Sequence, residues 1–214
     1  MTTRGASSAS ERAAAGMAPD IARAAARLFA RRGYDATSVR EIVEAAGVTK
    51  PTLYYHFGSK EGLAQALLTV PMEAFVARLL ACLGASNDPV DDLIAQIDAH
   101  FDFCRESPDR ARFVYALFFG PLGSELSSEL ARFAEGITAV LLQGVDRLAS
   151  ARVIDPAGVG SFATACRGMI VIHSMDFLYQ SAELGPDLAR TIVSDLLRGF
   201  GAGTEVLRTR GLQR

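Results

Sequence analysis

Apolar residues recur every three or four positions along most of this 214-residue chain, and prolines, glycines and helix-capping residues separate the stretches. This spacing is typical of helices that bury one face, and the alternation typical of half-buried strands is absent. The predicted helices cover about 19–32, 38–46, 50–58, 59–83, 89–106, 108–119 and 124–150, and two more begin at Asp155-Pro156 and Gly185-Pro186. Pro71 should kink or split the fourth helix, where a hinge could form. The predicted fold class is therefore all-α.

Two short helices joined by a tight turn follow the first helix. Thr37 and Ser38 are N-cap residues that precede a helix with one apolar face. Gly47 stands where a helix end favours a left-handed backbone, and Thr49 can cap the second helix. Pro51 is tolerated in the first turn of that helix, because the amides there have no intrahelical acceptor. The pattern predicts a helix-turn-helix.

The second of these helices should present polar and aromatic groups to a partner. Leu53 and Phe57 lie four positions apart and can face the core. The remaining outward positions are Lys50, Thr52, Tyr54, Tyr55 and His56. Ser59 can cap the next helix, which carries Lys60 in its first turn, where the helix dipole disfavours a cation but a phosphate would favour one. An ordinary helical hairpin is the alternative, and this exposed surface argues against it.

Two runs in this region resemble the DNA-binding domain of TetR-family transcriptional regulators. They are L-F-A-R-R-G-Y-D-A-T-S-V-R-E-I at 28–42 and T-L-Y-Y-H-F-G-S-K-E-G-L at 52–63. The resemblance covers the first quarter to third of the chain, and the remainder resembles the family only in length and all-helical character. It implies a three-helix DNA-binding domain at 18–64, followed by a larger helical ligand-binding and dimerisation domain at 65–214.

In this interpretation the helix at about 50–56 enters the major groove of double-stranded DNA. Lys50 and Arg40 are the candidates for contacts to base edges, preferring guanine, while Thr52 and Pro51 could meet a thymine methyl group. The resemblance implies contacts to backbone phosphates from Thr37 or Ser38, Thr49, Tyr54, Tyr55, His56 and Lys60.

The charge distribution gives weak support to a DNA-binding N-terminus. Lys and Arg number 9 against 6 Asp and Glu in residues 1–62, a net charge of +3, whereas residues 63–214 have 13 against 18, a net charge of −5. The three cysteines lie far apart without a C-x-x-C motif, which indicates neither a disulfide framework nor a zinc ribbon and fits a cytoplasmic location. The longest uncharged runs are shorter than the roughly 18 apolar residues of a membrane span.

The first residues differ in composition from the rest of the chain. They are rich in Ala, Ser and Gly, contain no bulky apolar residue, and lack the hydrophobic segment of a signal peptide. A disordered tail is therefore predicted at 1–17. Arg4 and Arg12 could reach into a minor groove, but a solvated tail is the favoured interpretation.

The last two predicted helices carry apolar stripes that suit binding to a partner helix. The stripes are Phe162, Cys166, Met169, His173 and Phe177 on one helix, and Leu188, Ile192, Leu196, Gly199 and Gly203 on the other. Either stripe could instead be ordinary core. The resemblance favours a partner, because in TetR-family proteins the final two long helices pair with those of a second subunit. It implies a homodimer through about residues 156–208, which needs a near-palindromic operator.

The middle of the chain is the expected sensor region, because six aromatic residues fall within twenty positions there. These aromatics could line an apolar cavity with Tyr115 and His173 as polar anchors, or they could simply fill the core. The candidate ligand-binding residues are His100, Phe101, Cys104, Tyr115, Phe118, Phe119, Met169 and His173. The effector expected from such a lining is a small apolar or aromatic molecule.

No catalytic, metal or cofactor site is expected. His100 and Cys104 are spaced like two metal ligands on one helix, but a metal site needs further ligands and the sequence offers no evident ones. The same residues lack a glycine-rich phosphate loop, a nucleophile elbow or an oxyanion-forming turn.

The function predicted is a ligand-responsive transcriptional repressor that binds its operator as a dimer and is released by a small molecule. One alternative is a small-molecule-binding or enzymatic helical domain that does not bind DNA. Another keeps the DNA-binding fold but makes the protein an activator or a co-repressor-dependent regulator.

Overall fold

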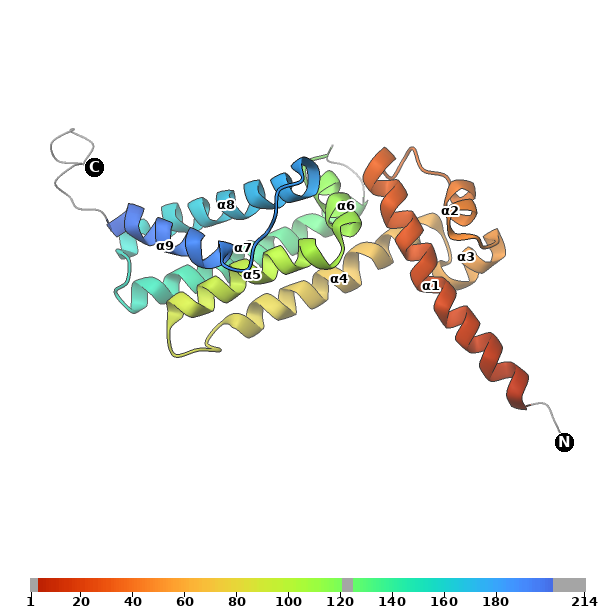
Figure 1. Cartoon of the computed structure of the whole chain (residues 1–214), viewed down its shortest axis with the longest axis horizontal. Helices are drawn as coiled ribbons and strands as arrows, with labels where there is room; N and C mark the ends of the chain where they lie inside the picture. The colour runs from red at the N-terminus through yellow and green to blue at the C-terminus, as the bar shows by residue number, and fades with distance from the viewer. Residues whose placement is uncertain (1–3, 121–124, 202–214) are drawn as a thin grey trace. The chain divides into compact units, whose positions relative to one another are not determined.

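The structure, a computed structural model of the chain, describes residues 4–120 and 125–201 (Figure 1). Every regular element within these residues is helical, which confirms the all-α fold class. The elements are α1 (Arg4–Arg32), α2 (Val39–Ala46), α3 (Lys50–Phe57), α4 (Lys60–Cys82), α5 (Pro89–Glu106), α6 (Pro108–Phe118), α7 (Glu125–Ser150), the short 3-10 helix η1 (Pro156–Gly158), α8 (Val159–Gln180) and α9 (Leu188–Gly201).

The helices pack into two compact units. The first contains the described residues up to Ala74 together with Ser107–Ala134, and the second contains Phe75–Glu106 together with the described residues from Glu135 onward. The division falls inside α4, a few residues after Pro71, and again inside α7. The functional domain limits at 1–17, 18–64 and 65–214 stay a prediction, and the packing units do not coincide with them.

Helix α1 begins earlier than the sequence predicts. Its backbone is helical from Arg4 onward, and Pro19 lies inside it rather than in its first turn. The structure therefore differs from the disordered tail predicted at 1–17 over residues 4–17, and the tail as a separate region stays a prediction. Ala13–Ala15 have the highest helix propensity of any residue type, which favours continuing the helix even though these residues offer no apolar face. This first part of α1 extends away from α2 and α3 in Figure 1.

The core of the first unit forms around Phe29 of α1. Its ring is fully buried, lies edge-on to Tyr34 with the centroids 5.3 Å apart, and contacts Phe113 of α6 at 5.1 Å. By length and composition α4 could cross a membrane, but its apolar residues Leu63 and Leu68 are fully buried within the protein.

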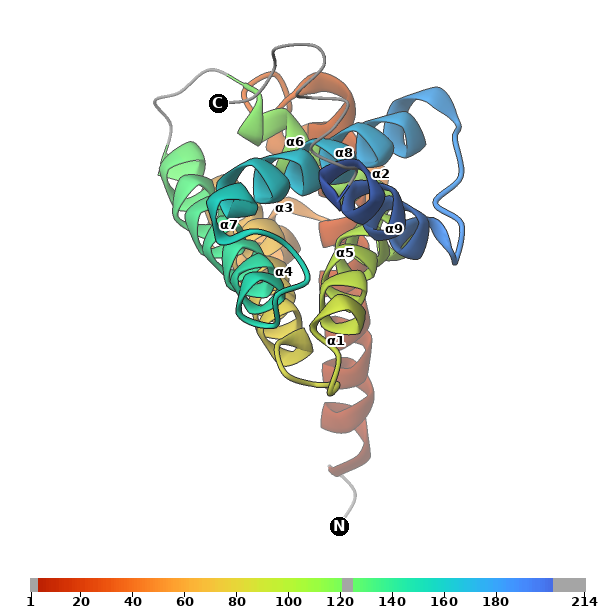
Figure 2. The same cartoon turned by 90° about the vertical axis from the view of Figure 1, so that its left-hand side faces the viewer.

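In the second unit α5, α8 and α9 pack against one another and lie side by side in both views (Figures 1 and 2). Phe162 and Cys166 of α8 and Ile192 of α9 are buried there. These members of the two predicted stripes therefore belong to the core, which was the alternative interpretation, whereas Met169 is exposed. Gly203, the last member, lies outside the described residues.

Asp92 near the start of α5 organises the loop that follows α4. Its carboxylate is almost completely buried and accepts hydrogen bonds from the backbone N–H groups of Gly84 and Ser86, both at 2.8 Å. Arg147 of α7 approaches the same carboxylate at 3.2 Å. Burial raises the pKa of Asp92, but the backbone donors and Arg147 together outweigh this effect and hold the pKa below its ordinary value. The carboxylate is therefore charged and fully engaged at neutral pH.

Candidate functional site

Local capping interactions define α2 and the turn after it. The Ser38 hydroxyl accepts a hydrogen bond from the Glu41 backbone N–H, and the Glu41 carboxylate accepts one from the Ser38 N–H at 2.8 Å, which is a capping box. Gly47 ends the helix with φ of 66°, and the N–H of Val48 then donates to the carbonyl of Val43 at 3.0 Å. These contacts produce the predicted tight turn.

Helix α3 follows directly after this turn and buries one side in the core. Thr49 is its N-cap, and the Thr49 and Thr52 hydroxyl oxygens lie 2.9 Å apart. Leu53 is fully buried. Tyr54 and Tyr55 remain 46% and 82% exposed, and Lys50 and Pro51 are exposed as well. The two neighbouring tyrosines and Lys50 form an exposed surface of aromatic and cationic groups on α3, which is compatible with the predicted contacts to DNA.

Lys60 is positioned by an interaction that the sequence analysis missed. Its ammonium lies 4.2 Å from the centre of the Tyr34 ring, and Ser59 caps α4 through a 2.8 Å hydrogen bond from the Gly62 N–H. A cation over an aromatic face is attracted by the electron-rich ring. The contact keeps a positive charge in the first turn of α4, where phosphate binding was predicted, and only the aromatic character of Tyr34 hinted at it.

Two carboxylates on α2 pair with arginines, one at the end of α1 and one on α2 itself. Arg40, predicted to contact bases, pairs with Glu44 at 2.7 Å while remaining exposed, and Arg32 pairs with Glu41 at 2.5 Å. The spacing of four residues between Arg40 and Glu44 was the available signal for the first pair. An exposed pair of this kind contributes little to stability, so it does not conflict with the predicted base contact of Arg40.

Two predicted phosphate contacts differ from the expectation of outward-facing groups. Thr37 is 1% exposed, and its hydroxyl donates to the carbonyl of Gly33 at 2.8 Å, so it braces the chain before α2 and is not available to DNA. Ser38 is the exposed member of that pair. The Nε2 atom of His56 is buried and has no hydrogen-bond partner in the described part of the chain, so in this conformation that nitrogen faces the protein.

The predicted ligand-binding residues divide between the two units. His100, Phe101, Cys104 and His173 lie in the second unit, where Phe101 and Cys104 are buried and Phe101 is edge-on to His173. Tyr115, Phe118 and Phe119 lie in the first unit, where Tyr115 stacks on Phe119 and both phenylalanines are exposed. Met169 is also exposed. Within the second unit, the structure brings Phe101 into contact with His173.

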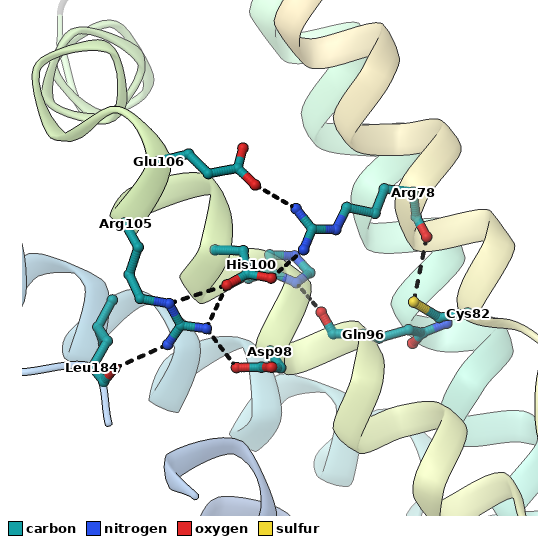
Figure 3. Close-up of polar contacts among 9 residues, drawn as sticks. Arg78, Cys82, Gln96, Asp98, His100, Arg105, Glu106 and Leu184 are labelled. Atoms are coloured by element: carbon teal, nitrogen blue, oxygen red, sulfur yellow. Dashed lines mark hydrogen bonds and ion pairs between the residues drawn. The ribbon is translucent and has the colours of Figure 1, made fainter. Parts of the chain in front are cut away.

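His100 is held inside the second unit by aromatic and backbone contacts. Its ring lies edge-on to Phe75 with the centroids 5.0 Å apart, and its Nδ1 is 2.8 Å from the backbone carbonyl of Gln96 (Figure 3). Because a carbonyl oxygen can only accept, Nδ1 carries the proton. Burial lowers the pKa of His100 to about 4, and the hydrogen bond to Gln96 opposes this only in part. The ring is therefore neutral at physiological pH.

This neutral histidine makes the protein sensitive to acid. The unfolded chain binds a proton at His100 near pH 6.5, whereas the folded protein does not until about pH 4. The free energy of unfolding should therefore decrease as the pH falls from 7 to 5, with about 1–2 kcal/mol due to His100. Urea unfolding at both pH values measures this, and His100→Phe should reduce the pH dependence by that amount. An unchanged pH dependence in the variant would show that His100 is not the group responsible.

An ion-pair network surrounds the end of α5 (Figure 3). The Asp102 carboxylate accepts from Arg78 of α4 and, at 2.6 Å, from Arg105. Arg105 also pairs with Asp98 at 2.7 Å and donates to the carbonyl of Leu184, which precedes α9. These contacts tie α4, α5 and the segment before α9 together within the second unit.

His100 and Cys104 are the pair that is spaced like two metal ligands on one helix. Residues 4–120 and 125–201 contain no group of three or more His, Cys, Asp or Glu side chains placed to hold a metal ion. Burial raises the pKa of the Cys104 thiol to about 11, so this thiol is neutral at physiological pH.

Comparison with known proteins identifies the N-terminal region. Residues 21–67 match the model of the bacterial regulatory proteins of the tetR family. The transcriptional activator FasR of Mycolicibacterium smegmatis is 36% identical over 92 residues, which are 43% of this chain and 42% of FasR. The transcriptional repressor ComR of Escherichia coli is 39% identical over 85 residues, 40% of each chain. The chain thus matches about two fifths of the length of these curated relatives.

The fold similarity extends over most of the chain. AibR, solved in complex with isovaleryl coenzyme A and operator DNA, superposes with a TM-score of 0.64 over 86% of this chain and 97% of AibR, at 21% sequence identity. At that identity the similarity establishes the fold alone. The sequence match and the fold agree: residues 21–67 match the tetR family of bacterial regulatory proteins, and the chain as a whole has the fold of such a regulator.

Proposed function

We propose that this protein is a ligand-responsive transcriptional repressor that binds a near-palindromic DNA operator and releases it when a small molecule binds. The observation that carries the proposal is the surface of α3, on which Lys50, Tyr54 and Tyr55 are exposed while Leu53 anchors the helix in the core. Lys50 supplies a donor for a guanine edge, and the tyrosine hydroxyls reach phosphate oxygens. Ser38, Thr49 and Lys60 add further donors along the same segment.

The protein acts as a homodimer through α8 and α9. Met169, Ile172 and Tyr179 of α8 are exposed, and their spacing places them along one side of the helix. Such an apolar surface is typical of a site that binds another protein. A two-fold symmetric dimer presents two copies of α3, and these address half-sites separated by about one or more turns of DNA.

Effector binding in the second unit is coupled to DNA binding through the chain itself. Helix α4 begins directly after α3 and continues into the second unit, where Arg78 ties it to α5. Pro71 lies between these two parts of α4 and provides the hinge. A coupling free energy of about 1–3 kcal/mol changes operator affinity by about 5- to 150-fold.

Known relatives support a regulatory role, which is activation in some of them and repression in others. FasR is named an activator and ComR a repressor, while AibR was solved with both isovaleryl coenzyme A and operator DNA. The effect on transcription depends on where the operator lies relative to the promoter, and repression is the proposal for this chain. Its place of action is the cytoplasm, where the DNA is.

Selection of bound fragments from genomic DNA tests the proposal. The purified full-length protein, without added ligand and at near-physiological salt, should enrich fragments that share a near-palindromic sequence. Tyr54→Ala, which removes a half-exposed side chain from α3, should stay folded and lose the enrichment. A folded wild-type protein that enriches no sequence would contradict a repressor that is active without ligand.

A further inference from the structure

Three polar side chains form a line along the inner side of α5. Gln96, His100 and Cys104 follow one another at intervals of four residues, which is close to one helical turn. Gln96 and Cys104 are each only 1% exposed, and His100 packs against Phe75. These three residues, termed the α5 polar line, therefore lie along one side of α5, with Gln96 and Cys104 buried in the second unit and His100 partly exposed between them.

Part of this polar surface has no partner in the protein. Both side-chain atoms of Gln96, Oε1 and Nε2, are buried without a hydrogen bond in the described part of the chain. The hydroxyl of Ser174 on α8, the helix that packs against α5, is also buried and lies beside the Cys104 thiol, whose pKa it lowers. Folded proteins pair nearly all buried polar groups, because an unpaired group loses its hydrogen bonds to water without replacement. An apolar residue would cost less at the position of Gln96.

The neighbouring helix α7 is shaped to accommodate Gln96. Gly144 is buried, and a Cβ atom at this position would lie 2.5 Å from Oε1 of Gln96, closer than a real contact allows. In this conformation the amide lies in the space that the missing side chain of Gly144 leaves beside α7. Two positions on different helices thus combine to keep an unpaired amide in an otherwise apolar interior.

The hydrogen-bonding groups along the line carry no charge. His100 donates through Nδ1 to the Gln96 carbonyl, which leaves Nε2 as an acceptor on the neutral ring. The arginines drawn in Figure 3, Arg78 and Arg105, are engaged by the carboxylates of Asp98, Asp102 and Glu106. No guanidinium of this network is left to neutralise an anionic group.

We propose that the α5 polar line, together with Ser174, holds the effector through uncharged hydrogen-bonding groups. The effector is then a mainly apolar molecule that carries a ketone, hydroxyl or amide, and carboxylates bind poorly because their charge would be buried without a counter-ion. Gln96 can donate to a carbonyl or accept from a hydroxyl, which makes it the central anchor. This inference rests on the proposed function, because it names the effector class of the regulator.

Binding of a neutral naphthyl ketone to the full-length protein tests this assignment. The probe is 6-propionyl-2-dimethylaminonaphthalene, whose emission moves to longer wavelength when its carbonyl accepts a hydrogen bond. The wild type should bind it saturably, and Gln96→Met should weaken binding about tenfold, the value of one hydrogen bond, and shift the bound emission to shorter wavelength. Ser174→Ala is the second variant and should also weaken binding.

Gln143→Met is the matched control, because Gln143 is exposed on α7 next to Gly144. It should bind the ketone like the wild type. Thermal unfolding supplies a second readout: Gln96→Met should keep or raise the melting temperature, since it removes unpaired buried polar atoms. If Gln96 had a purely structural role, Gln96→Met would instead lower the melting temperature without weakening the binding of the probe.

Three results would overturn the inference: no saturable binding of the ketone to the wild type, equal binding by the wild type and both variants, or equal affinity for 2-naphthoate. DNA binding measured on the same samples separates this failure from failure of the proposed function. If the ketone test fails but the wild type and Gln96→Met still bind the operator, the proposed regulator stands and only the effector class is rejected. Loss of sequence-specific DNA binding by the wild type itself would reject the regulator.

Discussion

Replacing Lys50 by alanine should lower affinity for the operator by about 1–3 kcal/mol, which is about 5- to 150-fold, and relax the preference at one base pair of each half-site. Lys50 is exposed in the first turn of α3, and no ion pair among the described residues engages its ammonium. Its loss removes a donor to a base edge without disturbing the core. Fluorescence anisotropy with the operator and with single-base variants measures both effects.

Tyr54→Phe is the comparison for Lys50→Ala. It removes a hydroxyl from a half-exposed ring and should weaken binding to operator and random DNA by similar factors, because phosphate contacts carry no sequence information. If Lys50→Ala and Tyr54→Phe change binding to operator and random DNA equally, the division between base reading and phosphate contact is wrong.

Replacing Asp92 by alanine should lower the free energy of unfolding by about 3–5 kcal/mol, a large fraction of the about 5–15 kcal/mol that stabilises a typical domain. The variant leaves the backbone N–H groups of Gly84 and Ser86 without their acceptor and Arg147 without its carboxylate. Two charge-assisted hydrogen bonds of about 1.5–3 kcal/mol each account for the loss. Urea unfolding at pH 7 measures it.

Asp91→Ala provides the matched control, because Asp91 is the exposed neighbour with only a 3.7 Å ion pair to Arg190. Asp91→Ala should change the free energy of unfolding by no more than about 0.5 kcal/mol. The lowered pKa of Asp92 means that its contribution is complete at neutral pH and is lost only as the pH falls below about 4. Similar losses in the Asp91 and Asp92 variants would show that the carboxylate does not organise the loop.

Local signals explain why the helix-turn-helix could be predicted in detail. The capping box of Ser38 and Glu41, the left-handed Gly47 and the N-cap Thr49 each depend on residues only a few positions apart. At Thr37, local sequence signals were not sufficient. Either of two neighbouring hydroxyls could cap α2, and the turn that joins Gly33 to Thr37 decided which one was buried.

Features that depend on tertiary packing could not be predicted as well from the sequence. Helix α8 is apolar on most of its surface, so the sequence could not tell that Phe162 faces the core while Ile172 faces outward. Asp92 and Asp91 are indistinguishable in sequence, because only the path of the loop before α5 selects the buried one. Gln96 went unnoticed because a polar residue in a helix is usually solvated. The available signal was its place between the apolar Leu93 and Ile97.

The affinity of the purified protein for its selected palindrome, compared with a single half-site over a range of salt concentrations, tests the central claim most directly. Two chains should bind each palindrome, the half-site should bind more weakly, and the logarithm of the binding constant should fall linearly with the logarithm of salt concentration as phosphate contacts are lost. Binding by one chain, or equal affinity for palindrome and shuffled DNA, would contradict a dimeric regulator that reads its operator through α3.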